Sequence, residues 1–149
     1  MKRPPRGLAI DISSSVRRLN VSRALVREAA AATLRAERVK DAMLSITFVG
    51  RAAISRINRR YLGHQGPTDV ISFGLDRSGR RGAVVGDVYI CVEVARDNAR
   101  RQRISAGEEL LRLVVHGTLH VLGYDHPTGA ERTTSRMWRK QERILARVL

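Results

Sequence analysis

The segment at residues 106–122 places the strongest constraint on how this chain can fold. Its apolar side chains recur nearly all the way round a helix, not along one stripe. Such a helix has to be covered on every side, so we expect it to be the central, buried helix of a layered domain. Ser105 and Glu108 have the spacing of a capping box at its start. Gly123 can adopt the left-handed conformation that ends a helix.

Hydrophobic periodicity predicts the other elements. Alternating apolar residues predict four strands, at 8–12, 43–49, 70–73 and 83–90. Helical spacing predicts further helices at 23–37, 52–61, 93–103 and 129–148. Strands and helices alternate at first and helices dominate later. We therefore predict an α+β fold, a single mixed sheet of about four strands with helices packed on it, spanning 1–149 as one domain.

The helix predicted at 52–61 should be amphipathic. Its inward residues would be Ile54, Ile57 and Tyr61. Arginines would lie on the outer side of this helix and along the helix at 93–103: Arg51, Arg56, Arg59, Arg60, Arg96, Arg100, Arg101 and Arg103. If they form one basic face, the affinity for RNA should fall steeply with salt.

Charge points to an anionic partner. The chain has 28 Lys and Arg against 14 Asp and Glu, a formal net charge of +14. Nucleic acid is the first expectation and a membrane surface the second. Aromatic residues make up only 4%, which argues against a platform on which bases stack.

We expect a cytoplasmic protein with no membrane partner. No apolar run approaches the roughly 20 residues needed to cross a bilayer. The basic start precedes a short apolar stretch that carries Asp11, so we expect no signal peptide. The lone Cys91 suits a reducing compartment. We expect it to be a small buried residue and not a metal ligand.

Three of the four histidines lie within residues 116–126. His116 and His120 are four apart, so they share one face of the predicted central helix. The turn after Gly123 can bring His126 back toward them. Three nitrogen ligands and a metal-bound water are the arrangement of a catalytic zinc site, whereas structural zinc sites usually have four protein ligands. We therefore predict one Zn²⁺ per chain on these three histidines.

The spacing of the three histidines is also that of the metzincin proteases, with one departure. In HExxH proteases a glutamate directly after the first histidine acts as the general base. Here that position is Gly117, which has no side chain. This departure counts against a metal-dependent protease.

The string from His116 to His126 resembles the signature of the YbeY-type endoribonucleases. Two further segments resemble the same family, at residues 67–73 (PTDVISF) and 86–90 (GDVYI). The resemblance implies the same α+β fold and a zinc-dependent, single-strand-specific endoribonuclease. It further implies a role in ribosomal RNA maturation at the 16S 3′ end and in ribosome quality control. The implied partners are ribosomal RNA and ribosome-associated proteins.

The chain departs from this family at Leu62, where many members carry an arginine before the glycine that follows the helix. Arg59 shares a helix face with position 62 and could supply the missing charge to the transition state. In or near the matched segments, Thr68 and Ser72 are candidate hydrogen-bond donors to the substrate. His64 is either an exposed loop residue or a phosphate contact.

Some roles stay open from the sequence. Asp69, Asp87 and Asp125 could each orient a ligating histidine, although the first two could simply cap strand ends. Arg112 shares the histidine face and could stabilise charge, but an ion pair with Glu108 is the favoured role. Rival functions are a protease-like metal hydrolase, a non-catalytic RNA-binding ribosome-assembly factor and a protein with purely structural zinc.

Overall fold

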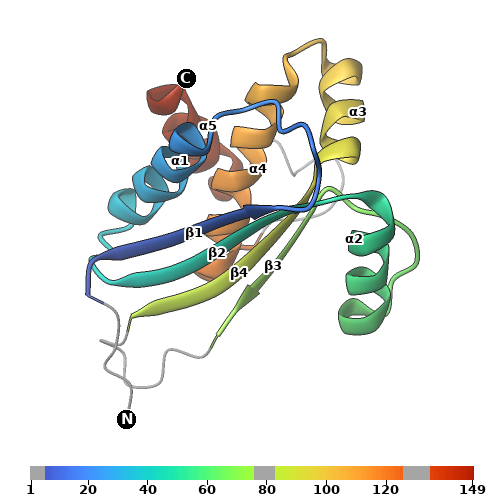
Figure 1. Cartoon of the computed structure of the whole chain (residues 1–149). Coiled ribbons are helices and arrows are strands. Elements are labelled where there is room, and N and C mark those ends of the chain that lie inside the picture. Colours follow the sequence, from blue (N-terminus) through green and yellow to red (C-terminus); the bar gives the residue numbers. More distant parts are fainter. Residues whose placement is uncertain (1–5, 76–82, 126–134) are drawn as a thin grey trace.

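A mixed four-stranded sheet forms the base of the fold in a computed structural model that describes residues 6–75, 83–125 and 135–149. The strand order is β1-β2-β4-β3, from β1 (Leu8–Ser14), β2 (Ala42–Val49), β3 (Val70–Gly74) and β4 (Val84–Cys91). Strands β1, β2 and β4 are parallel, and β3 pairs antiparallel with β4. The predicted α+β fold with one mixed sheet is confirmed (Figure 1).

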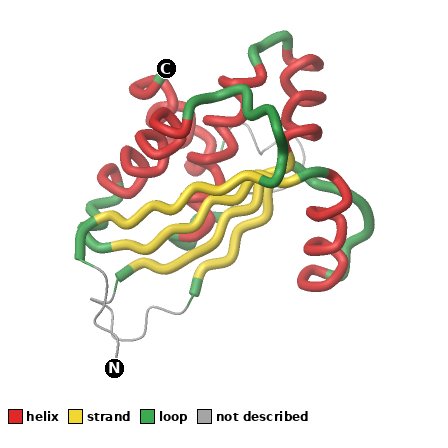
Figure 2. Tube along the Cα trace, in the orientation of Figure 1, coloured by secondary structure: helices red, strands yellow, loops and turns green. Residues whose placement is uncertain are grey.

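The helices, drawn red in Figure 2, begin and end close to the predicted residues by their bounds. They are α1 (Arg23–Ala36), α2 (Arg51–Ile57), α3 (Val92–Gln102), α4 (Ala106–Val121) and α5 (Arg136–Val148). The last helix was predicted from residue 129, and the part of that prediction before 135 lies outside the described residues. No helix in the described parts is both long and apolar enough to cross a bilayer.

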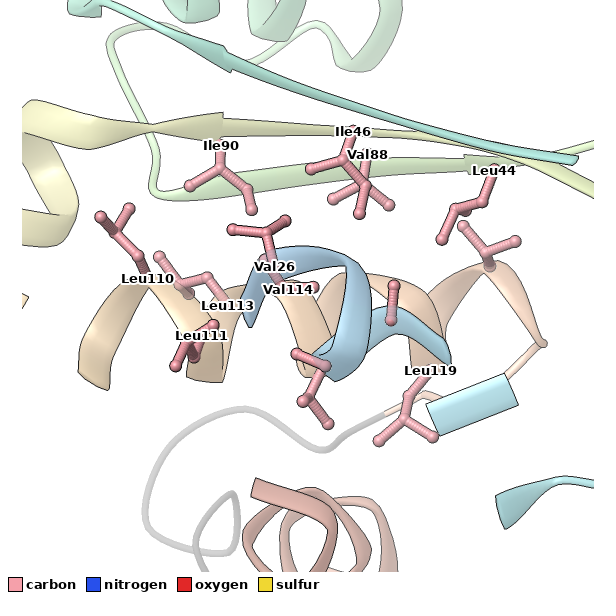
Figure 3. Packing of buried hydrophobic residues seen from close by; sticks show 14 of the residues in the cluster. Val26, Leu44, Ile46, Val88, Ile90, Leu110, Leu111, Leu113, Val114 and Leu119 are labelled. Atoms are coloured by element: carbon pink, nitrogen blue, oxygen red, sulfur yellow. The ribbon is translucent and has the colours of Figure 1, made fainter. Parts of the chain in front are cut away.

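Helix α4 is the central helix, as predicted. One side packs on the sheet, where Val88 and Ile90 of β4 meet Leu110 and Val114 (Figure 3). Helices α1 and α5 cover its other sides. Ser105 caps its start by accepting a hydrogen bond from the backbone of Glu108. Burying this helix on all sides removes most of its apolar surface from water, which is the main favourable term in folding.

Gly117 allows α4 to approach the sheet closely. A Cβ atom at this position would lie 2.6 Å from Val88 Cγ1 and 3.1 Å from Ser72 Oγ. The Ser72 hydroxyl donates to the Gly117 carbonyl at 3.0 Å. The side chain that a protease would carry here is therefore excluded by packing.

Helix α2 packs on the opposite face of the sheet. Its Ile54 contacts Ile71 and Cys91, which alternate with the strand residues that face α4. Cys91 is fully buried, as predicted. The chain then continues as a single π-helical stretch, η1 (Asn58–Leu62). The prediction that Tyr61 faces inward is wrong, since it is 60% exposed, because the wider π-turn shifts side chains away from 3.6-residue spacing.

Candidate metal centre

His116 and His120 project from one face of α4 and meet at their ring nitrogens. The two Nε2 atoms lie 3.0 Å apart. His116 is only 5% exposed, whereas His120 is half-buried. The predicted pairing of these two side chains through their four-residue spacing is confirmed.

Hydrogen bonds determine which nitrogen of each ring carries the proton. His116 Nδ1 lies 2.6 Å from Gln141 Oε1, and His120 Nδ1 lies 2.8 Å from the Tyr124 carbonyl oxygen. The Gln141 amide nitrogen donates to Glu142 at 3.0 Å, so its oxygen faces the ring. Both acceptors therefore require a proton on Nδ1. In the neutral rings both Nε2 atoms then carry lone pairs.

This arrangement fits a bound cation. Two lone pairs aimed at each other across 3.0 Å repel, and a positive ion between them removes the repulsion. Two nitrogens bound to one tetrahedral zinc would be about 3.4 Å apart, so a small adjustment is sufficient. A metal-binding histidine commonly donates its second N–H to an oxygen acceptor, as both rings do here.

The third predicted ligand, His126, lies outside the described residues. Within the described residues, no group of three His, Cys, Asp or Glu side chains is placed to hold a metal ion. The structure therefore brings together two of the three predicted ligands. Burial raises the pKa of the Cys91 thiol and so disfavours the thiolate that binds metal.

The end of α4 positions the acceptor for His120. Gly123 has a φ of +98°, the left-handed conformation predicted for it. Its N–H donates to the His120 carbonyl, and the N–H of Tyr124 donates to Leu119. These two bonds form a Schellman motif. The motif turns the Tyr124 carbonyl toward the His120 ring.

A polar hollow of about 400 Å³ lies beside His116. It is lined by Asp69, Asn98, Gln102, Glu109, Arg112, Leu113, His116, Trp138 and Gln141. These residues come from the start of β3 and from helices α3, α4 and α5. The hollow is therefore built from segments far apart in the sequence.

Arg112 is held by three carboxylates at the edge of this hollow. It donates to Glu142 at 2.9 and 3.1 Å, to Glu109 at 3.2 Å and to Glu108 at 3.0 Å. Its side chain is 13% exposed. The favoured ion pair with Glu108 is confirmed. Glu108 therefore directs its carboxylate to Arg112, so only the Ser105 half of the predicted capping box is seen.

Burial and these contacts shift the pKa values of Arg112, Glu109 and Glu142. Burial lowers the pKa of Arg112, but hydrogen bonds to Glu142 and Glu108 outweigh it and raise that pKa above its ordinary value. Burial raises the pKa of Glu109 more than Arg112 lowers it. For Glu142 burial raises the pKa, but the hydrogen bonds from Arg112 and Gln141 and the charge of Arg112 together outweigh it and lower that pKa. The guanidinium is thus charged but already neutralised by its neighbours.

The Nδ1 partners of His116 and His120 are Gln141 and the Tyr124 carbonyl, which were not among the candidates considered from sequence. Asp69 accepts from the backbone of Val70 at 2.8 Å and from Asn98 at 3.2 Å, which confirms its alternative role as a cap at the start of β3. The sequence did carry a signal for Gln141. It is a polar residue on the apolar face of the last helix, and it is 1% exposed.

The candidate substrate residues lie in two places. Ser72 lies under α4, and the Thr68 hydroxyl donates to Asp69 at 3.5 Å, beside the hollow at His116. His64 is exposed in the loop after η1. Arg59 lines a second hollow, which shares no lining residue with the first.

Comparisons with known proteins agree on one family. The family model described as Endoribonuclease YbeY matches residues 10–149. Over 140 residues the chain is 34% identical to Endoribonuclease YbeY of Syntrophus aciditrophicus, covering 92% of this chain and 88% of that protein. It is 44% identical over 133 residues to Endoribonuclease YbeY of Geobacillus kaustophilus, covering 83% and 81%. The solution structure of TM1509 from Thermotoga maritima matches with a TM-score of 0.61 at 26% identity, covering 93% and 88%.

Proposed function

Because the chain belongs to the YbeY endoribonuclease family and is thus an RNA-hydrolysing enzyme, we propose that it is zinc-dependent and cleaves single-stranded RNA. Its metal ligands would be His116, His120 and His126. The observation that carries this proposal is the 3.0 Å approach of two Nε2 atoms whose rings each direct Nδ1 toward an oxygen acceptor. A divalent ion held there would polarise a water molecule and the scissile phosphate.

The chain's own residues would orient the metal ligands and bind the substrate. Gln141 and the Tyr124 carbonyl keep both imidazoles in the ligating tautomer. Thr68 is the better placed of the two proposed hydroxyl contacts, since it lies beside the hollow at His116, whereas Ser72 lies under α4. His64, exposed in its loop, is the further proposed contact to the substrate.

We propose ribosomal RNA as the substrate, with maturation of the 16S 3′ end and ribosome quality control as the process. The whole chain would act as one catalytic domain in the cytoplasm, with ribosome-associated proteins as partners. The net charge of +14 supports an RNA partner. The buried, protonated Cys91 suits a reducing compartment.

The test is a cleavage assay on labelled single-stranded RNA, with casein as a rival substrate, each with and without chelator. We expect chelator-sensitive cleavage of RNA and none of casein. His116→Ala should lose cleavage, and His64→Ala serves as the comparison outside the metal site. Cleavage of casein with intact RNA would favour a protease. RNA binding without cleavage by the metal-loaded protein would favour an assembly factor.

A further inference from the structure

A second hollow, of about 160 Å³, lies between α2, η1 and the loop that leads toward β3. It is lined by Ser55, Arg56, Arg59, Gln65 and Gly66. Guanidinium, hydroxyl, amide and backbone N–H groups can all donate hydrogen bonds. Among the described residues, no carboxylate lines this hollow. Its chemistry is that of a site for an anion.

The wall of the hollow is held in place by a buried residue beneath it. Asn58 is 5% exposed, and its amide nitrogen donates to the Gly66 carbonyl at 2.9 Å. The N–H of His64 donates back to the Asn58 carbonyl at 3.3 Å. Gly63 allows this return of the chain, with a φ of +69°. The loop is therefore fastened against η1 before any ligand binds.

The guanidinium charges of the two arginines that line the hollow are available to bind an anion. Across the described parts of the chain, neither Arg56 nor Arg59 forms an ion pair or a hydrogen bond. Other arginines already form ion pairs. Arg51 and Arg100, for example, both bind Asp97. Both side chains are exposed, and both line the same hollow.

We propose that Arg56 and Arg59 bind a backbone phosphate of the RNA substrate, at a site separate from the metal centre. The inference rests on the proposed function, because it takes RNA as the ligand. Guanidinium groups match phosphate oxygens in charge and geometry. The hollow beside His116 does not suit this task, since Asp69 and Glu109 line it and Arg112 is already neutralised.

The two hollows are close enough to bind one RNA strand. Gly66 lines the hollow at Arg59 and Asp69 lines the hollow at His116, and only two residues lie between them in the chain. Even a fully extended chain places their Cα atoms within about 11 Å. Because α2 and α4 lie on opposite faces of the sheet, an RNA strand held at Arg56 and Arg59 would reach His116 by passing this loop at the edge of the sheet, beside β3. Its phosphate contact would act on substrate binding and not on the bond being cleaved.

The experiment compares two double variants of the full chain. Arg56→Gln/Arg59→Gln removes the proposed site, and Arg27→Gln/Arg143→Gln removes two exposed arginines from α1 and α5. Binding of a short labelled single-stranded RNA is measured by fluorescence anisotropy at several salt concentrations, with chelator present to prevent cleavage. Initial rates with metal are measured in parallel.

We expect the site variant to bind RNA about tenfold more weakly at low salt. The slope of log affinity against log salt should fall by about 0.7, the value for one phosphate on a single strand. The loss in rate should appear in KM and not in kcat. The control variant should stay close to the wild type in both.

Three results would overturn the assignment. One is equal RNA binding by the site variant and the control. Another is unchanged binding with a reduced kcat, which would place Arg59 in the chemistry. The third is loss of inorganic phosphate binding with RNA binding intact, which would indicate a free-anion site. By contrast, site-dependent RNA binding by a wild type that never cleaves RNA would contradict the proposed function and leave this inference standing.

Discussion

His116 on α4 and Gln141 on α5 are joined by a 2.6 Å hydrogen bond between Nδ1 and Oε1, and both side chains are almost fully buried. An amide can present either its oxygen or its nitrogen. Here Glu142 accepts from the nitrogen, so the oxygen faces the ring. The last helix thus determines which imidazole nitrogen is directed toward His120.

Replacing Gln141 with Leu should weaken zinc binding by about 10- to 100-fold, the usual cost of removing the partner that orients a ligand. Competition with a chromophoric chelator measures this affinity. Gln102→Leu is the matched control, because Gln102 lines the same hollow but makes no hydrogen bond to either histidine. Nitrogen NMR should show that His116 loses its single tautomer only in the first variant. Equal zinc affinity in both variants would contradict the role of Gln141.

Metal content gives a direct test of the ligands. Untagged protein should contain about one equivalent of zinc or another divalent ion. His116→Ala should lose the metal, because one of its ligands is removed. His64→Ala should retain it, since His64 is exposed in a loop. Elemental analysis measures both, and full retention in His116→Ala would refute the site.

Arg112→Met should destabilise the fold by about 3 to 5 kcal/mol, because it leaves the buried carboxylate of Glu109 and two half-buried carboxylates without their cation. Urea denaturation at neutral pH measures the free energy of unfolding. Arg100→Met is the matched control and should change it by less than about 0.5 kcal/mol, since Arg100 is 76% exposed. Similar losses in both variants would mean that the contacts of Arg112 with its three glutamates contribute little to stability.

Gly117→Ala should lower stability by up to about 2 kcal/mol. Alanine favours a helix by about 1 kcal/mol, but overpacking costs about 1 to 3 kcal/mol, and the new Cβ would lie 2.6 Å from Val88 Cγ1. In a Val88→Ala background the same change should be neutral or stabilising. Urea denaturation of the four proteins gives the coupling, and additive effects would show that Gly117 is not a packing requirement.

The ion pair between Glu37 and Lys140 predicts a dependence of stability on pH. Burial would raise the pKa of Glu37, but the hydrogen bonds from Lys140 and Tyr124 and the nearby positive charges together outweigh it and lower that pKa below 4.5. The same bond raises the pKa of Lys140 above 10.5. The stability from Glu37 is present above pH 4.5 and lost as the pH falls through its folded pKa. That from Lys140 is present below pH 10.5 and lost as the pH rises through its folded pKa.

Lys140→Met should therefore cost about 1 kcal/mol between these limits, and its deficit should shrink toward both extremes. Thermal unfolding across this pH range measures the deficit. Lys40→Met removes an exposed lysine and is the control. A deficit that does not change with pH would show that the loss comes from packing of the lysine stem and not from the ion pair.

Local spacing in the sequence determined the elements and the pairing of two ligands. The all-round apolar pattern of 106–122 predicted a central helix, and the four-residue interval of His116 and His120 predicted their contact. Both follow from helix geometry within one segment. Tyr61 was predicted to face inward and does not, because a π-turn breaks that geometry.

Tertiary packing alone decided what surrounds the site. Gln141 is 25 residues from His116 along the chain, and their bond exists because α5 packs against α4. Packing between elements also determines the strand order and the steric need for Gly117. It likewise places Arg59 in a different hollow from the histidines. Spacing determines which side chains of one helix share a face. Which residues of different elements meet depends on how those elements bury their apolar faces against one another.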